Sequence, residues 1–218
     1  MSLKKITCIL IIAIICSFSI RTVGTLFPQI FQNIHMVKGT ILVNTFFILS
    51  HFLFWLIFYR DYASGKGAIL KKTCLLPVIG SFAVLLLYLK KLSFVFDMEI
   101  AFPLFFMNPC VDAFIPAVAA IFSLIFFVVF KNSLEPEEEG MLRKPILSMI
   151  GGTSPFLLLH LIVLVNFIAT GAFQWLEHMP RAIAVGTVPL IVIALFLMLH
   201  FYYRFYCLLE SLQNKNDS

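Results

Sequence analysis

The segment FILSHFLFWLIFY, residues 47–59, is followed by the polar turn RDYASGKGAI at 60–69 and by LKKTCLLPVIGSFAVLLLYL at 70–89. With the apolar residues before it, the first segment is about 20 residues long, enough to cross a hydrocarbon core of roughly 30 Å as a helix. Backbone polar groups in lipid are satisfied only within helices or closed barrels. Residues 47–89 therefore predict a helical hairpin that enters and leaves a membrane at one face.

A similar pattern returns at residues 119–161, where AAIFSLIFFVVF meets KNSLEPEEEGM and LRKPILSMIGGTSPFLLLHL follows. A shift of 72 residues places Leu142-Arg143-Lys144 on Leu70-Lys71-Lys72 and Gly152 on Gly80, without a gap in the turn. About ten of the 43 aligned positions are identical. We therefore predict two tandem helical hairpins, 47–89 and 119–161.

The composition excludes a soluble domain, because 61% of the residues are hydrophobic and only 12% are charged. Soluble chains carry roughly 25% charged residues. The net charge of +5 does not indicate nucleic acid, since the basic residues lie in short turns and are not interleaved with stacking aromatics. The five cysteines form neither a metal-binding spacing nor a complete disulfide framework, and we expect no metal and no cofactor. They are Cys8, Cys16, Cys74, Cys110 and Cys207.

The apolar blocks predict an all-α membrane bundle of about six transmembrane helices, forming a single integral membrane domain over residues 1–218. The third block contains Pro77 and Gly80, so a five-helix alternative has it re-enter the membrane without crossing. Residues 26–36 and 90–109 are expected at the interface or, for the second, re-entrant, and 204–218 form a short cytoplasmic tail. The expected helices are 5–23, 40–59, 73–89, 111–130, 146–173 and 182–203. Trp55 and Tyr59 indicate where the second of them leaves the lipid.

The distribution of basic residues predicts the orientation. With six helices and the N-terminus inside, eleven basic residues are cytoplasmic and five are outside. Both termini are then cytoplasmic, in a multi-pass protein of the plasma membrane. The pair Lys90-Lys91 does not fit the bias, and re-entry of 73–89 would explain it. The inner set is Lys4, Lys5, Arg60, Lys66, Lys71, Lys72, Lys131, Arg143, Lys144, Arg204 and Lys215, and the outer set is Arg21, Lys38, Lys90, Lys91 and Arg181.

One candidate catalytic set is Glu138-Glu139-x-x-x-Arg143 followed by Phe156-x-x-x-His160. These strings resemble the EExxxR and FxxxH motifs of the CAAX-processing type of intramembrane proteases. The resemblance implies paired glutamates and a histidine that activate a water for peptide hydrolysis. Against it, the glutamates are expected in a polar turn, and Arg143 coincides with Lys71 in the repeat.

A second candidate set is Cys110, His178 and Arg181, all expected near the outer face. These residue types resemble the Cys–Arg–His set of exosortase-like transpeptidases, which implies a nucleophilic thiol with a base and a cation nearby. The family's sequence context around the cysteine is missing, since Cys110 follows Asn108-Pro109.

Three histidines at membrane depth, His51, His160 and His200, are candidate cofactor ligands. Polar groups in lipid usually face the bundle interior and often mark a pathway or a site. The simpler interpretation is that His51 and His160 make hydrogen bonds between helices, with each other or with Asn44, Ser50 or Asn166. Such bonds stabilise a bundle by about 0.6 kcal/mol each.

From the sequence we expect a small non-enzymatic membrane protein, a sensor, accessory or assembly component that acts through helix packing. The alternatives are an intramembrane hydrolase and a small transporter, because parallel repeats also build carriers. The expected partners are the lipid bilayer and another membrane protein or a second copy of the chain, and not nucleic acid.

Overall fold

In the computed structural model the described residues are 1–27, 29, 34–100, 102–103, 108, 110–170 and 181–216. Within these ranges the chain is helical and contains no strand. The long helices are α1 (Leu3–Leu26), α2 (Ile34–Asp61), α3 (Ala68–Val95), α5 (Cys110–Asn132), α6 (Pro136–Thr170) and α8 (Arg181–Asn216), with a short 3-10 turn η2 (Ala63–Gly65) after α2.

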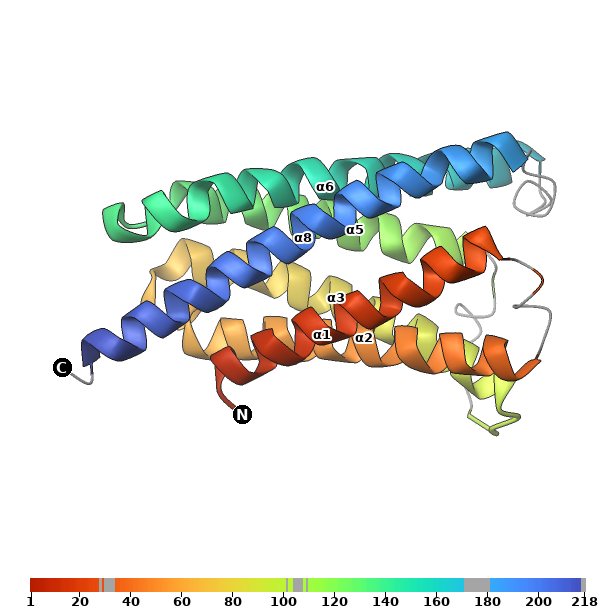
Figure 1. Ribbon diagram of the computed structural model, residues 1–218, viewed down its shortest axis with the longest axis horizontal. Helices are drawn as coiled ribbons and strands as arrows, with labels where there is room; N and C mark the ends of the chain where they lie inside the picture. The colour runs from red at the N-terminus through yellow and green to blue at the C-terminus, as the bar shows by residue number, and fades with distance from the viewer. Residues whose placement is uncertain are drawn as a thin grey trace.

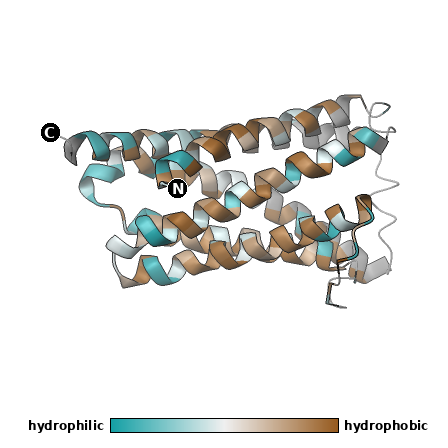
Figure 2. Cartoon of the chain, turned by 90° about the horizontal axis from the view of Figure 1, so that it is seen from below, coloured by the Kyte–Doolittle hydropathy of each residue, from teal (hydrophilic) through white to brown (hydrophobic). Residues whose placement is uncertain are grey.

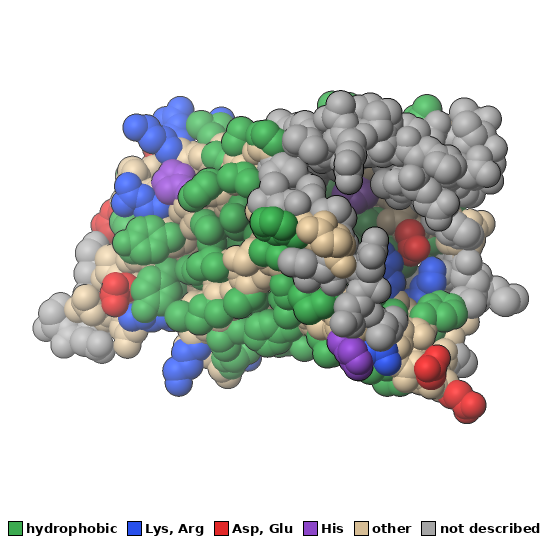
Figure 3. Space-filling view, turned by 45° about the vertical axis from the view of Figure 1, so that its right-hand side comes forward, with side chains coloured by type: hydrophobic (Ala, Val, Ile, Leu, Met, Phe, Trp, Pro, Cys, Tyr) green, Lys and Arg blue, Asp and Glu red, His purple; other side chains and the backbone are tan. Residues whose placement is uncertain are grey.

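Each of these six helices contains a stretch apolar and long enough to cross a membrane, in the part of the chain that the structure describes. Hydrophobic residues occupy the middle of the bundle, and hydrophilic residues gather at the helix ends (Figure 2). In the space-filling view, hydrophobic side chains form a band with charged side chains toward both ends (Figure 3). The expected all-α, multi-pass integral membrane protein is therefore confirmed.

The helices form a closed ring in which each packs against its neighbours in the chain. α1 contacts α2, and the order continues through α3, α5, α6 and α8, which returns to α1. Both termini, the α2–α3 turn and the α5–α6 turn lie at one end of the bundle (Figure 1). We call this the termini end and its opposite the far end. Lys4 joins α1 to α8 at the termini end, with its Nζ 3.2 Å from Glu210 Oε1.

Several expected helix boundaries are wrong. The third helix runs from Ala68 to Val95 and is long enough to span, so the re-entrant alternative for 73–89 is not what the structure shows. Residues 26–36 were expected at the interface. Of these, Leu26 ends α1 and residues 34–36 begin α2. The expected tail 204–218 continues α8 as a helix to Asn216. Within 90–109, residues 96–100 are exposed beyond the end of α3, and 101, 104–107 and 109 lie outside the described residues.

Aromatic side chains fill the interior of the helix bundle in the half nearer the termini end. Trp55 and Phe58 of α2 meet Phe126 of α5, with the Trp55 and Phe126 centroids 4.8 Å apart at an angle of 76°, and Phe54 of α2 meets Tyr202 of α8. Edge-to-face contacts of this kind add to the free energy gained by burying the rings. Trp55 was expected at the membrane interface and is instead almost completely buried in this cluster. We call the cluster the aromatic core; its other members are Tyr62, Phe127, Phe130, Phe201, Tyr202 and Phe205.

Residues 47–89 and 119–161 each fold as helix, turn and helix, in α2–α3 and α5–α6. Gly80 is buried against Ala119, and Gly152 is buried against Leu197, so both glycines face another helix. The two turns differ, however, because α6 begins at Pro136 whereas the position aligned with the start of α3 is Gly140. That the two hairpins are copies of one unit stays a prediction.

Candidate functional site

Glu138 lies at the centre of a buried polar cluster at the termini end. Its carboxylate accepts a hydrogen bond of 2.6 Å from the Tyr62 hydroxyl, and Lys66 Nζ lies 2.8 Å from the same oxygen, Oε1. Lys66 Nζ also lies 2.8 Å from Glu135 Oε1. The Glu138 side chain is only 3% exposed. This cluster fastens the α2–α3 turn to the start of α6.

Glu138 also caps α6. Pro136 takes the first helical position, where its missing N–H costs nothing. Glu138, two residues later, accepts from the backbone N–H of Glu135 with its second oxygen at 3.3 Å. This is the return bond of a capping box. Sequence reasoning placed Glu138 and Glu139 in a polar turn, which is wrong, because both belong to the first turn of α6.

The cluster also holds the charge of Lys66. Burial alone would lower the pKa of this lysine, but hydrogen bonds and Coulomb attraction from Glu135 and Glu138 outweigh burial and raise the pKa above its ordinary value of 10.5. Lys66 is therefore a fixed cation at neutral pH. A buried carboxylate needs such a partner, because leaving it unpaired costs several kcal/mol, roughly 3–5 when one partner is removed.

The residues that resemble the CAAX-processing motifs do not converge. Glu139 turns outward and pairs with Arg143 at 2.7 Å, one helical turn along an exposed face. His160 follows Glu138 by 22 residues on the same helix. At a rise of about 1.5 Å per residue the two are roughly 33 Å apart, too far to act on one water. The two glutamates and the histidine therefore do not form one catalytic site in this structure.

Of the second candidate set, Cys110 is the first residue of α5 and partly buried. His178 lies outside the described residues, and only the backbone of Arg181 is described, at the start of α8. The structure therefore places one member of this set at the far end and leaves its relation to the other two a prediction.

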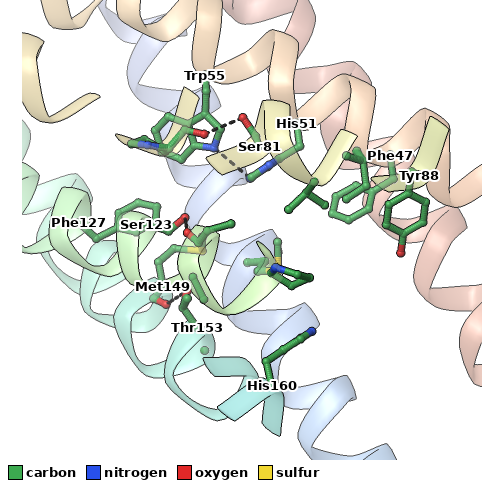
Figure 4. Close-up of a pocket in the computed structure, with 18 of the residues that line it drawn as sticks. Phe47, His51, Trp55, Ser81, Tyr88, Ser123, Phe127, Met149, Thr153 and His160 are labelled. Carbon is green, nitrogen blue, oxygen red and sulfur yellow. Dashed lines mark hydrogen bonds between the residues drawn. The ribbon is translucent and has the colours of Figure 1, made fainter. Parts of the chain in front are cut away.

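A cavity of about 260 Å³ lies inside the ring of helices, and every one of the six long helices contributes to its wall. Trp55 and Phe127 of the aromatic core border it (Figure 4). Tyr88 of α3 and Pro116 of α5 line it as well. The cavity therefore occupies the interior beside the aromatic core, in the direction of the far end.

The sequence explains why the interior is open here. Aromatic rings fill the aromatic core. Beside it, the inner-face positions that line the cavity carry small residues or proline: Ser81, Ala119, Ala120, Ser123, Gly152, Thr153, Pro77 and Pro116. Small side chains leave space that no neighbour fills unless the helices move closer. The hydroxyls of Ser81, Ser123 and Thr153 each donate to a carbonyl of their own helix, at 2.6, 2.9 and 2.7 Å.

His51 lies on the wall of the cavity and is held by Trp55. The indole N–H of Trp55 donates to His51 Nε2 at 3.0 Å, and the two rings meet edge to face at 90° (Figure 4). The expected partners of His51 were His160, Asn44, Ser50 or Asn166, and the described partner is instead this indole, one turn away on the same helix. Because Nε2 accepts, the neutral imidazole carries its proton on Nδ1.

His160 of α6 also lines the cavity, and in Figure 4 it lies on the other side from His51 of α2. His200 is exposed on α8 and is not among the residues of the cavity wall. The structure thus brings two of the three candidate histidines to one cavity. Among the described residues no group of three or more His, Cys, Asp and Glu side chains could share a metal ion.

At the far end, Lys90 near the end of α3 is almost completely buried and pairs with Asp112 in the first turn of α5, Nζ to Oδ1 at 3.5 Å. Lys90-Lys91 was the pair that opposed the charge bias. The carboxylate of Asp112 neutralises the charge of Lys90, so the two lysines do not require residues 73–89 to re-enter the membrane.

We compared the chain with protein families, curated proteins and solved structures. The chain matches no protein-family profile, no curated protein and no solved structure.

Proposed function

We propose that this chain is a non-enzymatic multi-pass membrane protein that senses a small apolar molecule inside the bilayer, with the central cavity as its binding site. One observation carries the proposal: a single cavity is walled by all six long helices. A molecule bound there contacts every helix, so its presence changes the packing of the whole ring. A sensor or accessory protein that acts through helix packing needs this coupling.

The polar groups outside the cavity support a structural rather than a catalytic role. Glu138 caps a helix and binds Lys66 and Tyr62, and Glu139 pairs with Arg143 on the surface. Each of these glutamates is accounted for by a local contact. The chemistry that remains inside the membrane is that of an apolar pocket with a few convergent polar groups, which is typical of a binding site.

We further propose that the termini end faces the cytoplasm of the plasma membrane. Basic residues of the inner set, among them Lys66, Lys71, Arg143 and Lys144, belong to the α2–α3 turn and to the first turns of α3 and α6, segments that lie at that end (Figure 1). The far end carries fewer basic residues, and Lys90 there is paired. An excess of lysine and arginine on one side favours a cytoplasmic location of that side.

Native mass spectrometry of the protein purified in a mild detergent tests the proposed function. Ala120 lines the cavity, and Ala120→Phe fills part of it. Ile121, the next residue of α5, is 39% exposed on the lipid face, and Ile121→Phe is the matched control. We expect wild-type protein and Ile121→Phe to retain a bound molecule that Ala120→Phe lacks. A wild-type protein without any added mass, or the same added mass in all three, would contradict the proposal.

A further inference from the structure

We infer that the central cavity takes a neutral molecule of one or two rings that carries a carbonyl, and that His51 donates the hydrogen bond to this carbonyl through Nδ1. This inference rests on the proposed function and names the class of molecule that the cavity would bind. Three features support it: the size of the cavity, the lack of a fixed charge on its wall and the tautomer of His51.

The size of the cavity limits the ligand to a small ring system. An engineered apolar cavity of about 150 Å³ binds one benzene molecule. At about 260 Å³ this cavity is larger, so it accommodates one substituted ring or two fused rings. Flat rings also suit its wall, because the aromatic side chains of Phe47, Trp55 and Phe127 line it.

The wall selects a neutral molecule. No aspartate, glutamate, lysine or arginine is among its described residues. Burying an ion without a partner of opposite charge costs far more than burying a hydrogen-bonded neutral group. The ion pairs of the described residues lie at the two ends of the helices, away from this wall. An ionised ligand would therefore find no compensating charge, whereas an uncharged ring pays no such penalty.

His51 supplies a hydrogen-bond donor on the wall of the cavity. The hydroxyl hydrogens of Ser81, Ser123 and Thr153 are engaged by carbonyls of their own helices. His51 differs, because its Nε2 is occupied by the Trp55 indole and its proton is therefore on Nδ1. Trp55 thereby fixes both the tautomer and the orientation of the imidazole. A carbonyl oxygen is the acceptor that a neutral, lipid-soluble ring compound can bring to this N–H.

The probe for the test is radiolabelled 2,3-dimethyl-1,4-naphthoquinone, whose methyl groups block addition of the exposed cysteine thiols. Unlabelled 2,3-dimethylnaphthalene, which has the same rings and no carbonyl, is the competitor. Binding is measured on protein in nanodiscs, with empty nanodiscs as background. The variants are His51→Leu, which removes the donor, and His200→Leu, an exposed histidine away from the cavity.

We expect saturable binding of the quinone, with dimethylnaphthalene about tenfold weaker, the ratio that one hydrogen bond provides. His51→Leu should bring the two compounds to equal affinity, and His200→Leu should keep the tenfold ratio. Equal affinities in wild-type protein, or an unchanged ratio in His51→Leu, would overturn the inference. The wild-type comparison does not depend on whether His51→Leu folds. If neither compound binds while native mass spectrometry still finds a bound molecule that Ala120→Phe lacks, the carbonyl-ring class is wrong and the cavity remains the binding site.

Discussion

Glu138 and Glu139 are adjacent in the chain and have different surroundings. Glu138 is buried and binds the Tyr62 hydroxyl, the Lys66 ammonium and the backbone of Glu135. Glu139 is half exposed and forms one surface pair with Arg143. The pattern of paired glutamates before an arginine could be recognised in the sequence. Which of the two glutamates points inward could not, because that depends on where α6 begins.

The difference between the two glutamates predicts unequal effects on stability. Glu138→Gln keeps the size of the side chain but removes one of the two carboxylates that pair with Lys66, so we expect a loss of about 3 kcal/mol, the lower end for a broken buried pair because Glu135 remains. Glu139→Gln removes one exposed pair and should cost at most about 0.5 kcal/mol. Thermal unfolding in detergent, followed by circular dichroism, measures both. Equal losses would show that Glu138 is not the centre of the cluster.

The raised pKa of Lys66 predicts a pH dependence. A group whose pKa is raised on folding stabilises the protein fully below its unfolded pKa, and this stabilisation is lost as the pH rises through the folded pKa. From neutral pH upward, the difference in melting temperature between wild type and Lys66→Met should therefore stay constant up to pH 10.5, the ordinary pKa of lysine, and narrow above it. A difference that disappears between about pH 8 and 9 would contradict the pairing with Glu135 and Glu138.

At the scale of the helices, the described glycines of α3 and α6 differ in what surrounds them. A Cβ on Gly80 would lie 3.0 Å from the Ala119 Cα atom, so a side chain there would force α3 away from α5. A Cβ on Gly151 would meet nothing within 4 Å. Close approach of helix backbones at small residues is a common way to join helices in membranes.

The different surroundings of Gly80 and Gly151 predict different effects on stability when each is replaced by leucine. Gly80→Leu should destabilise the bundle by about 1–3 kcal/mol, because the overpacked backbone must move. Gly151→Leu, on an exposed surface, should leave the melting temperature unchanged or slightly raised, since leucine is a better helix former than glycine. Thermal unfolding of the two variants compares them directly. A stable Gly80→Leu variant would mean that α3 and α5 are not in close contact.

The number and kind of the helices could be predicted from the sequence, and their ends could not. Apolar blocks of membrane length are a direct signal, and all six expected helices are present among the described residues. The ends depend on contacts between distant residues. The hydrogen bond from the Glu135 N–H to the Glu138 carboxylate accompanies the start of α6 ten residues before the expected position, and packing of Leu208 in the hydrophobic core accompanies the extension of α8 to Asn216.

At the scale of the whole molecule, the closed order of the helices creates both the aromatic core and the cavity. The cavity could not be found from the sequence, although a signal was present. Inner-face positions change from phenylalanine to small residues and proline along α5, and from larger apolar residues such as Leu70 and Ile146 to small residues along α3 and α6. Seeing that change requires knowing which face of each helix points inward. The repeat, which relates α2–α3 to α5–α6, remains a prediction at this scale.

The central claim is that the chain crosses the membrane six times, which places the cavity within the bilayer, and we propose that the termini end is cytoplasmic. Labelling of single cysteines in a cysteine-free variant, in intact and opened cells, tests it most directly. The sites are Ser64→Cys, Glu137→Cys and Glu99→Cys, three exposed positions at helix ends or beyond them. We predict that a membrane-impermeant maleimide labels position 99 in intact cells, and positions 64 and 137 only after the cells are opened. Labelling of 64 and 137 from opposite sides, or of both from outside, would contradict the account.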